Sequence, residues 1–436
     1  METKLYQNDI VWNKIFEEYH ILSELEKNNC FIISSEKIRR FREPRFMAKY
    51  DHAVKLPKIF LDHNLSILPI TRGSYIIAPF KTFHSFETDA TTDDNIIHLP
   101  LPDYLQSLTY DTTITSETFA LNIAAASGIL SDFLETNRIE NNFLIPTVSG
   151  RMGSGIFDFQ IDNISSGTTQ LSINNAQIEI DAAYESCDFL AIFEAKNDLS
   201  EDFIIRQLYY PYRLWHNKIT KNIKTVFFVF SNGIFYLREY TFDDLLNYNS
   251  LRLTKYKKYT LENTTITTQD IQKVLREAPD IAETTVPFPQ ADSFERVINL
   301  CELLKSQTLL KSDITNEYAF TPRQTYYYTD AAIYLGLLEK TNVGSSSLFS
   351  LSNIGNTLLQ QQYKERQLGF CRQILSHKAF RDSLTLYFNT GRLPSRDELV
   401  AIMRESKLNI SSNETFKRRS ATILSWIKWI VSLINE

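Results

Sequence analysis

The chain has 436 residues, 43% of them hydrophobic, so it can bury more than one core and we expect several domains. Its net charge is −6, but residues 291–436 hold 18 basic and 14 acidic residues, which leaves 28 basic and 38 acidic residues in 1–290. Four scattered cysteines exclude a disulfide framework, and no leader pattern or apolar run of about 18 residues is present, so we expect a cytoplasmic protein without membrane contact.

The first part of the chain predicts short elements around a basic segment. Apolar residues recur at helical spacing over 8–28, 31–34 favours a strand, and 54–80 favours short strands and a helix. Most charge runs are solvated surface, but basic residues interleaved with Phe41 and Phe46 also suit DNA. The expected DNA contacts in this segment are Arg39, Arg40, Arg42, Arg45 and Lys49.

Residues 85–115 are polar and predict a loop, and the core of the chain follows them. A helix is expected from Glu117 to Leu134, with Ser116 as its N-cap. A three-strand meander is then expected over 156–161, 175–182 and 188–196, followed by a helix at 202–218 and strands at 225–230 and 234–237. This order predicts a mixed sheet flanked by helices. The glycine-rich turn at 150–155 either brings Arg151 to a DNA backbone or is only a tight turn.

Two of these strands end in charged side chains. Residues 188–196 form an apolar run that ends in Glu194 and Lys196, which share one face of a strand because side chains alternate. The preceding strand supplies Asp181, with Glu179 on the same face as an alternative. Two carboxylates suffice for Mg²⁺, the backbone carbonyl of Ala195 can add a ligand, and a lysine beside them can orient a water. The competing interpretation is an exposed salt bridge at the strand end.

The last part of the chain is helical. Residues 256–290 are polar with three prolines and predict a linker. Helices over 293–306, 312–320 and 321–339, with a hairpin at 344–351, predict a winged helix at 291–356. Arg323 and Gln324 begin its candidate recognition helix, where Arg suits guanine and Gln suits adenine, although a winged helix can also bind a protein. Residues 357–436 predict a helical C-terminal region.

The arrangement of Asp181 and then Glu194-Ala195-Lys196 resembles the PD-(D/E)XK nuclease superfamily, although Ile180 replaces the usual proline. Further segments resemble type II restriction endonucleases with a C-terminal winged helix: 43–52, 65–80, 177–186, 203–215, 322–340 and the closing RRSATILSWIKWI. The resemblance implies an α+β or α/β multidomain fold. Its domains would be an N-terminal DNA-binding region (1–110), a nuclease core (111–255), the linker, the winged helix and the helical region.

The resemblance also implies the roles of individual residues. Asp181, Glu194 and Lys196 would be catalytic, and Gln207 would support the lysine from the following helix, although Pro211 replaces the usual tyrosine. Glu117 occupies a position where related nucleases sometimes add an acid. The implied enzyme is a Mg²⁺-dependent, site-specific restriction endonuclease in which a metal-activated water hydrolyses double-stranded DNA and leaves 5′-phosphates.

Such an enzyme is expected to act as a homodimer and to accompany a separate DNA methyltransferase. Two other functions stay open: a modification-dependent or standalone defence nuclease, and a winged-helix DNA-binding regulator with an inactive nuclease core.

Overall fold

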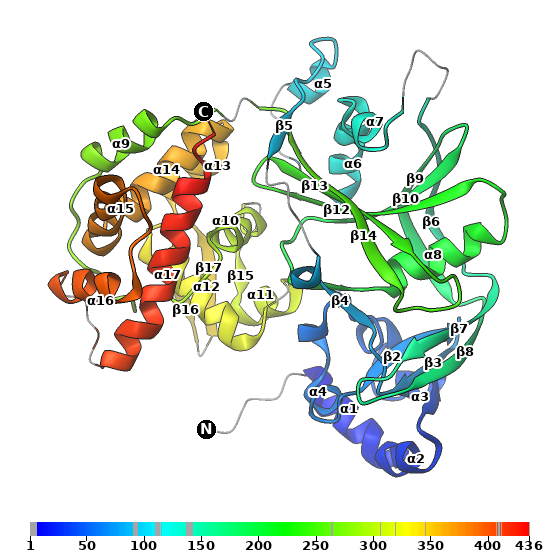
Figure 1. Ribbon diagram of the computed structural model, residues 1–436. Coiled ribbons are helices and arrows are strands. Elements are labelled where there is room, and N and C mark those ends of the chain that lie inside the picture. Colours follow the sequence, from blue (N-terminus) through cyan, green and yellow to red (C-terminus); the bar gives the residue numbers. More distant parts are fainter. Residues whose placement is uncertain are drawn as a thin grey trace. The chain divides into compact units, whose positions relative to one another are not determined.

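The computed structural model divides the chain into two compact units (Figure 1). The first unit contains 1–97, 101–230 and 235–259, and the second contains 98–100, 231–234 and 260–436. The structure describes all residues outside a few short stretches, which are 1–6, 90–94, 110–113, 115, 137–142, 263–264, 306, 319, 345, 407, 409, 411 and 436.

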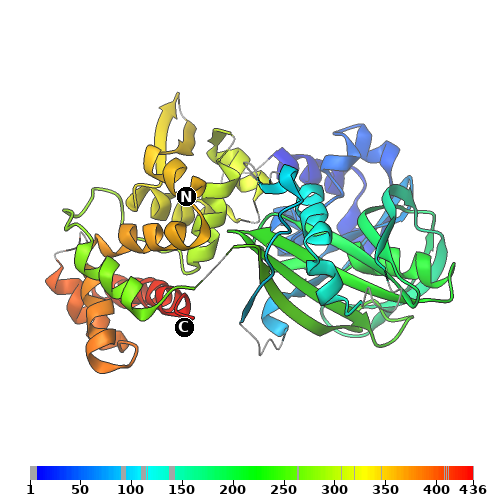
Figure 2. The same ribbon diagram turned by 90° about the horizontal axis from the view of Figure 1, so that it is seen from above.

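A seven-stranded mixed sheet forms the centre of the first unit. Its order is β5 (Ile96–His98), β14 (Leu251–Thr260), β13 (Ile234–Phe242), β12 (Asn222–Ser231), β10 (Phe189–Lys196), β9 (Gln177–Glu185) and β6 (Ile145–Gly153). Strand β10 pairs parallel with β12 and antiparallel with β9. Helices α6 (Glu117–Ala126) and α8 (Arg206–His216) both pack against β9 and β10 (Figures 1 and 2). The predicted mixed sheet with flanking helices is therefore present, in an α+β protein.

The predicted meander is wrong in its first strand. The segment at 156–162 (β7) pairs with β8 (Thr168–Asn174) in a separate two-stranded sheet, and β6 takes its place beside β9. The alternating side chains Phe157, Phe159 and Ile161 of β7 are buried in one cluster with Tyr209 and Tyr210 of α8. Alternation predicts a half-buried strand but not the sheet that it joins, so the sequence pattern fitted both arrangements.

Several other predicted elements have different bounds. The helix expected at 8–28 is split by His20, which has φ 51°, into α1 (Gln7–Glu18) and α2 (Ile21–Asn28). Gly128, with φ 88°, separates α6 from α7 (Ile129–Phe133). The helix expected from residue 202 starts later, after β11 (Asp202–Ile204), and the expected loop at 85–115 contains β5 and α5 (Gln106–Thr109) in its described part. The turn expected at 150–155 begins inside β6.

The N-terminal residues belong to the first unit and do not form a compact unit of their own. Strands β1 (Phe31–Ser34), β3 (Ser74–Ala78) and β2 (Ser66–Thr71) make an antiparallel sheet against Trp12 and Phe60. Strand β4 (Phe83–Ser85) pairs with β11, which directly precedes α8. This pairing connects the N-terminal region to the part of the core that carries Gln207.

The second unit contains helices around a small antiparallel sheet, ordered β15 (Leu309–Leu310), β17 (Ser346–Leu351) and β16 (Leu338–Val343). Helices α10 (Phe294–Leu303), α11 (Lys311–Glu317) and α12 (Pro322–Tyr334) precede the β16–β17 hairpin. The helices that follow belong to the same compact unit. They are α13 (Asn353–Gln360), α14 (Tyr363–Leu375), α15 (Lys378–Thr390), α16 (Arg396–Glu405) and α17 (Asn413–Ser432).

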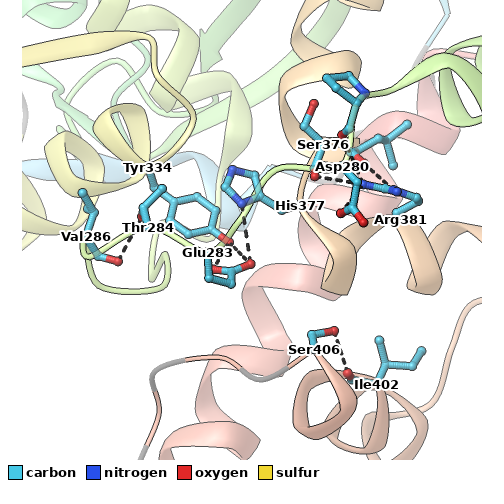
Figure 3. Close-up of polar contacts among 12 residues, drawn as sticks. Asp280, Glu283, Thr284, Val286, Tyr334, Ser376, His377, Arg381, Ile402 and Ser406 are labelled. Carbon is cyan, nitrogen blue, oxygen red and sulfur yellow. Dashed lines mark hydrogen bonds and ion pairs between the residues drawn. The ribbon is translucent and has the colours of Figure 1, made fainter.

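The described part of the expected linker at 256–290 is structured. It contains the end of β14 and α9 (Thr268–Glu277), and the segment after α9 is held by polar contacts (Figure 3). Asp280 accepts a hydrogen bond of 3.0 Å from Arg381. Glu283 accepts one of 3.0 Å from the hydroxyl of Tyr334 and lies 3.6 Å from Nδ1 of the buried His377. Polar composition predicted an exposed segment but not these partners in α12 and α15.

In the described part of the chain, no helix combines the length and the apolar character needed to cross a bilayer.

Candidate active site

Glu194 and Lys196 lie at the end of β10, a strand that is buried along almost its whole length. Only 6% of Glu194 is exposed, and its Oε1 accepts a hydrogen bond of 2.6 Å from Nζ of Lys196. The two side chains share one face of the strand, as alternation predicts. The interpretation as an exposed strand-end salt bridge is therefore wrong, because both charged groups are largely removed from solvent.

Asp181 joins this pair from the neighbouring strand β9. The regular pairing of β9 with β10 ends at Phe193 and Ala182, and beyond it Oδ2 of Asp181 accepts a hydrogen bond of 2.8 Å from the backbone N–H of Ala195. The register of β9 against β6 also shifts here, because Ala183 lies opposite Val148 while Ile180 lies opposite Gly150. Such a bulge redirects a side chain, which explains how Asp181 faces the tip of β10. That the Ala195 carbonyl is a metal ligand stays a prediction.

Gln207, in the first turn of α8, donates a hydrogen bond to the same Oε1 of Glu194 that accepts from Lys196. The structure thus brings Gln207 to the site, although its contact is with the glutamate and not with the lysine. Its own side-chain oxygen is buried and has no hydrogen-bond partner among the described residues. An unpaired buried amide oxygen is costly unless a ligand or water satisfies it.

Two further acids complete the cluster. Oδ2 of Asp51, from the turn before a short 3-10 helix (Ala53–Lys55), lies 4.0 Å from Nζ of Lys196. The charge of Glu117, the first residue of α6, raises the pKa of Lys196, and the charges of Asp181 and Asp51 raise the pKa of Glu117. The resemblance indicated Glu117, whereas Asp51 was missed because it lies on an irregular segment that no periodicity marks.

The electrostatics of the cluster are dominated by burial and by an excess of carboxylates. Burial raises the pKa of Glu194 to about 7, with Asp181 adding to the effect and Lys196 opposing it. Burial likewise raises the pKa of Glu117 to about 7. Burial would lower the pKa of Lys196, but Glu194, Asp51 and Glu117 outweigh it and the pKa is raised, so the lysine stays charged.

A histidine fixes the segment that carries Asp51. Nδ1 of His52 lies 2.7 Å from the backbone oxygen of Asp202, and its Nε2 lies 3.5 Å from the carboxylate of Asp198. Burial would lower the pKa of His52, but the bonds to Asp202 and the charge of Asp198 raise it. The N–H of Ala53 also donates to Asp202, at 3.1 Å. These contacts hold Asp51 beside Lys196.

Glu179, the alternative to Asp181, is occupied elsewhere. Its carboxylate accepts a hydrogen bond of 3.2 Å from Nε of Arg151 and lies 3.9 Å from Nζ of Lys49. Among the described residues, it forms no hydrogen bond or ion pair with Glu194 or Lys196. The geometry therefore favours Asp181 as the second acid. It also brings Lys49 and Arg151 together at Glu179, which lies two residues before Asp181 on β9.

The other basic residues of the N-terminal segment are distributed around α3 (Ser35–Arg39) and the turn that follows it. Arg39 lies 3.8 Å from Glu43, and Arg40 contacts Glu18 at 3.1 Å. Arg42 donates to Asn8, and Arg45 lies over the ring of Phe46. These are mostly exposed contacts of the kind that contribute little to stability and are easily exchanged for a ligand.

The two predicted residues of the second unit differ in their surroundings. Arg323 is exposed and donates to the hydroxyl of Tyr327. Gln324 completes a capping box, in which its side-chain oxygen accepts a hydrogen bond of 2.8 Å from the N–H of Thr321. Reading adenine needs both the oxygen and the nitrogen of the amide, so this cap conflicts with the predicted base contact of Gln324.

The acids of the site suit a hard divalent cation. No group of three or more His, Cys, Asp or Glu side chains with metal-binding geometry occurs in the described part of the chain. Mg²⁺, however, is held by one or two carboxylates and retains waters. Asp51, Glu117 and Glu194 act electrostatically on Lys196. Burial raises the pKa of Glu117 and of Glu194, and the negative charge of Asp181 adds to both shifts. A cation between Asp181 and Glu194 would offset that charge.

Three family models match the chain, and each is described as a domain of unknown function. They cover 9–77 (DUF6996), 78–260 (DUF6997) and 296–435 (DUF7226). No curated protein and no solved structure matches. The candidate site combines the first two matched segments, because Asp51 lies in 9–77 and the other acids lie in 78–260.

Proposed function

We propose that the protein is a Mg²⁺-dependent endonuclease of the PD-(D/E)XK type that hydrolyses double-stranded DNA, as type II restriction endonucleases do. The observation that carries the proposal is the convergence of Asp181, Glu194 and Lys196. Glu194 and Lys196 form a largely buried ion pair at the end of β10, and Asp181 of β9 accepts a hydrogen bond from the backbone N–H of Ala195, the residue between them. Burying such a cluster opposes folding, so a function must account for it.

The chemistry follows from the residue types. A bound Mg²⁺, held by Asp181 and Glu194, would neutralise the scissile phosphate and lower the pKa of a water. Lys196 stays protonated between Glu194 and Asp51, so its part is to donate hydrogen bonds that orient the water and stabilise charge on the phosphate. Gln207 holds Glu194 in place from α8. The product would carry a 5′-phosphate.

The basic residues beside the acids support a polyanionic substrate. Lys49 and Arg151 meet at Glu179, next to Asp181, and Arg206 at the start of α8 acts electrostatically on Asp51. Cations at the rim of a carboxylate cluster fit a DNA backbone that must approach the acids without repulsion. Arg39, Arg40, Arg42 and Arg45 extend this positive charge along the N-terminal segment.

In this proposal the elements α10–α12 and β15–β17 of the second unit are a winged helix that binds DNA. Cutting both strands calls for two copies of the site, so the protein would act as a homodimer. A separate DNA methyltransferase would protect the host DNA.

The test is incubation of the purified chain with phage and plasmid DNA, with Mg²⁺ or with EDTA. Discrete fragments are expected only with Mg²⁺. Lys196→Ala should slow cleavage by at least about 10³-fold, which corresponds to about 4 kcal/mol. It should leave DNA binding in EDTA within a few-fold of the wild type.

The matched control is Lys221→Ala, which removes a lysine that is ion-paired with Glu185 near the opposite end of β10. It should cut normally. A wild-type chain that binds DNA but never cuts it would favour a DNA-binding regulator with an inactive core, and normal cutting by Lys196→Ala would refute the catalytic assignment.

A further inference from the structure

A second group of basic side chains lies on the second unit, around helix α12. Its members come from α11, α12, β16 and α17, elements far apart in the sequence. We define the α12 basic surface as Lys311, Arg323, Lys340, Arg418 and Arg419, with the aromatic residues Tyr326 and Tyr327.

Contacts connect these side chains into one surface. Lys311 lies over the ring of Tyr326, and Arg323 lies over the ring of Tyr327, to which it also donates a hydrogen bond. With its amide oxygen facing the arginines, Gln290 accepts from Arg418 at 3.1 Å and from Arg419 at 2.9 Å and donates to Tyr327 at 2.9 Å. The arginines of α17 thus adjoin the tyrosine that holds Arg323.

Lys340 and Lys311 belong to the same group through Asp330, on which Lys340, Lys311 and Arg419 all act electrostatically. Among the described residues, Asp330 is the only acid that acts electrostatically on Lys311 and on Arg419. Burial, reinforced by Lys340, lowers the pKa of Lys311 to about 8. Burial and the neighbouring Arg418 lower the pKa of Arg419. Three of the five cations therefore act on one carboxylate.

The charge of this surface is less balanced than that of neighbouring helices. Basic side chains on α14, α15 and the segment before α16 form ion pairs with acids, at 2.7 Å between Lys364 and Asp270 and at 2.7 Å between Arg392 and Glu398. None of the five cations has an acid within 4.0 Å in the part of the chain that the structure describes. Arg323, Lys340 and Arg418 are exposed, and Tyr326 is 52% exposed.

We propose that the α12 basic surface binds the phosphate backbone of double-stranded DNA, with Arg418 and Arg419 of α17 as contacts beside Arg323. This inference rests on the proposed function, since a nuclease must hold the duplex that it cuts. Cations release counterions when they meet phosphates, and the exposed Tyr326 and the partly exposed Tyr327 add hydrogen bonds and packing to sugar and phosphate. An acidic protein partner is the competing occupant.

The experiment measures binding of the full chain to a fluorescent duplex in EDTA, where no cleavage is required, at several salt concentrations. The variant Arg418→Ala/Arg419→Ala should bind about tenfold more weakly or worse, and its slope of log K against log salt should fall by about two. Arg323→Ala should lower the slope by about one, which provides an independent variant. The control Arg404→Ala/Lys428→Ala removes two cations from α16 and α17 outside the surface and should match the wild type.

Unchanged affinity and slope in both surface variants would overturn the inference. So would loss of binding to poly-glutamate with duplex binding intact, which would assign the surface to a protein partner. Cleavage assays on the same preparations separate the two proposals. If the wild type cuts DNA while the surface variants bind normally, only this inference fails, and if the variants weaken binding while the wild type never cuts, only the nuclease fails.

Discussion

Replacing Glu117 by Gln is expected to stabilise the protein when no divalent cation is present. Burial raises the pKa of Glu117 to about 7, and Asp181 and Asp51 add to that effect. In the unfolded chain the pKa is near the ordinary glutamate value of 4.5, so above pH 7 the fold carries a carboxylate that it disfavours. At about 1.4 kcal/mol per pKa unit the cost is about 3 kcal/mol.

Glu117 is only partly buried, so solvent screening reduces this cost to about 1–2 kcal/mol. Gln keeps the shape and removes the charge. The penalty is absent below pH 4.5, where the carboxyl is protonated in both states; it grows between pH 4.5 and 7 and is constant at higher pH, where the carboxyl is ionised in both states. In EDTA at pH 8 the unfolding midpoint of Glu117→Gln should therefore exceed that of the wild type by about 2–6 °C, and at pH 4.5 the two should coincide.

The assay is thermal unfolding at both pH values, with Glu135→Gln as the matched control. Lys255 lowers the pKa of the exposed Glu135, so its replacement should give no gain at pH 8. Mg²⁺ should raise the midpoint of the wild type more than that of Glu117→Gln, because the cation offsets the same charge. A variant that is no more stable than the wild type at pH 8, or equally more stable at pH 4.5, would refute the reasoning.

Two further predictions concern binding and packing. Arg151→Ala and Lys49→Ala should each lower the slope of log K against log salt for duplex binding by about one. The control Arg252→Ala, which removes an exposed ion pair from the same unit, should leave this slope unchanged. Equal slopes in all variants would contradict DNA contact at Glu179. Gly355→Ala should destabilise the protein by about 2 kcal/mol or more in denaturant unfolding, because its Cβ would lie 2.3 Å from the backbone oxygen of Leu337, and a normal midpoint would contradict this packing.

The sequence predicted the strand positions of Glu194 and Lys196 better than the contacts around them. Alternation placed Glu194 and Lys196 on one face, and their contact confirms it. It could not show that a bulge turns Asp181 toward Ala195, because a bulge adds a residue without changing composition. Asp51 reaches Lys196 from more than a hundred residues away, and only tertiary packing brings them together.

Other differences arise because local patterns fit more than one structure. The first strand of the predicted meander belongs to a separate sheet. The sequence could not show this, because side chains alternate with a period of two in every sheet. The polar segment after α9 was expected to be a linker, yet its polar side chains meet partners such as Arg381 and Tyr334. Gln324 is different, because Thr321 three residues before it is the sequence signature of a capping box. That signature was sufficient to predict a structural role.

The most direct test of the central claim compares Asp181→Asn with Glu179→Gln in Mg²⁺-dependent cleavage of a DNA that the wild type cuts. Both changes remove one carboxylate from β9, two residues apart. Asp181→Asn should cut about 10³-fold more slowly, because it removes a ligand of the proposed cation, which corresponds to about 4 kcal/mol. Glu179→Gln should stay within a few-fold of the wild type, since Glu179 pairs with Arg151 at the rim. Wild-type cleavage by Asp181→Asn, or loss of cleavage only in Glu179→Gln, would contradict the proposed site.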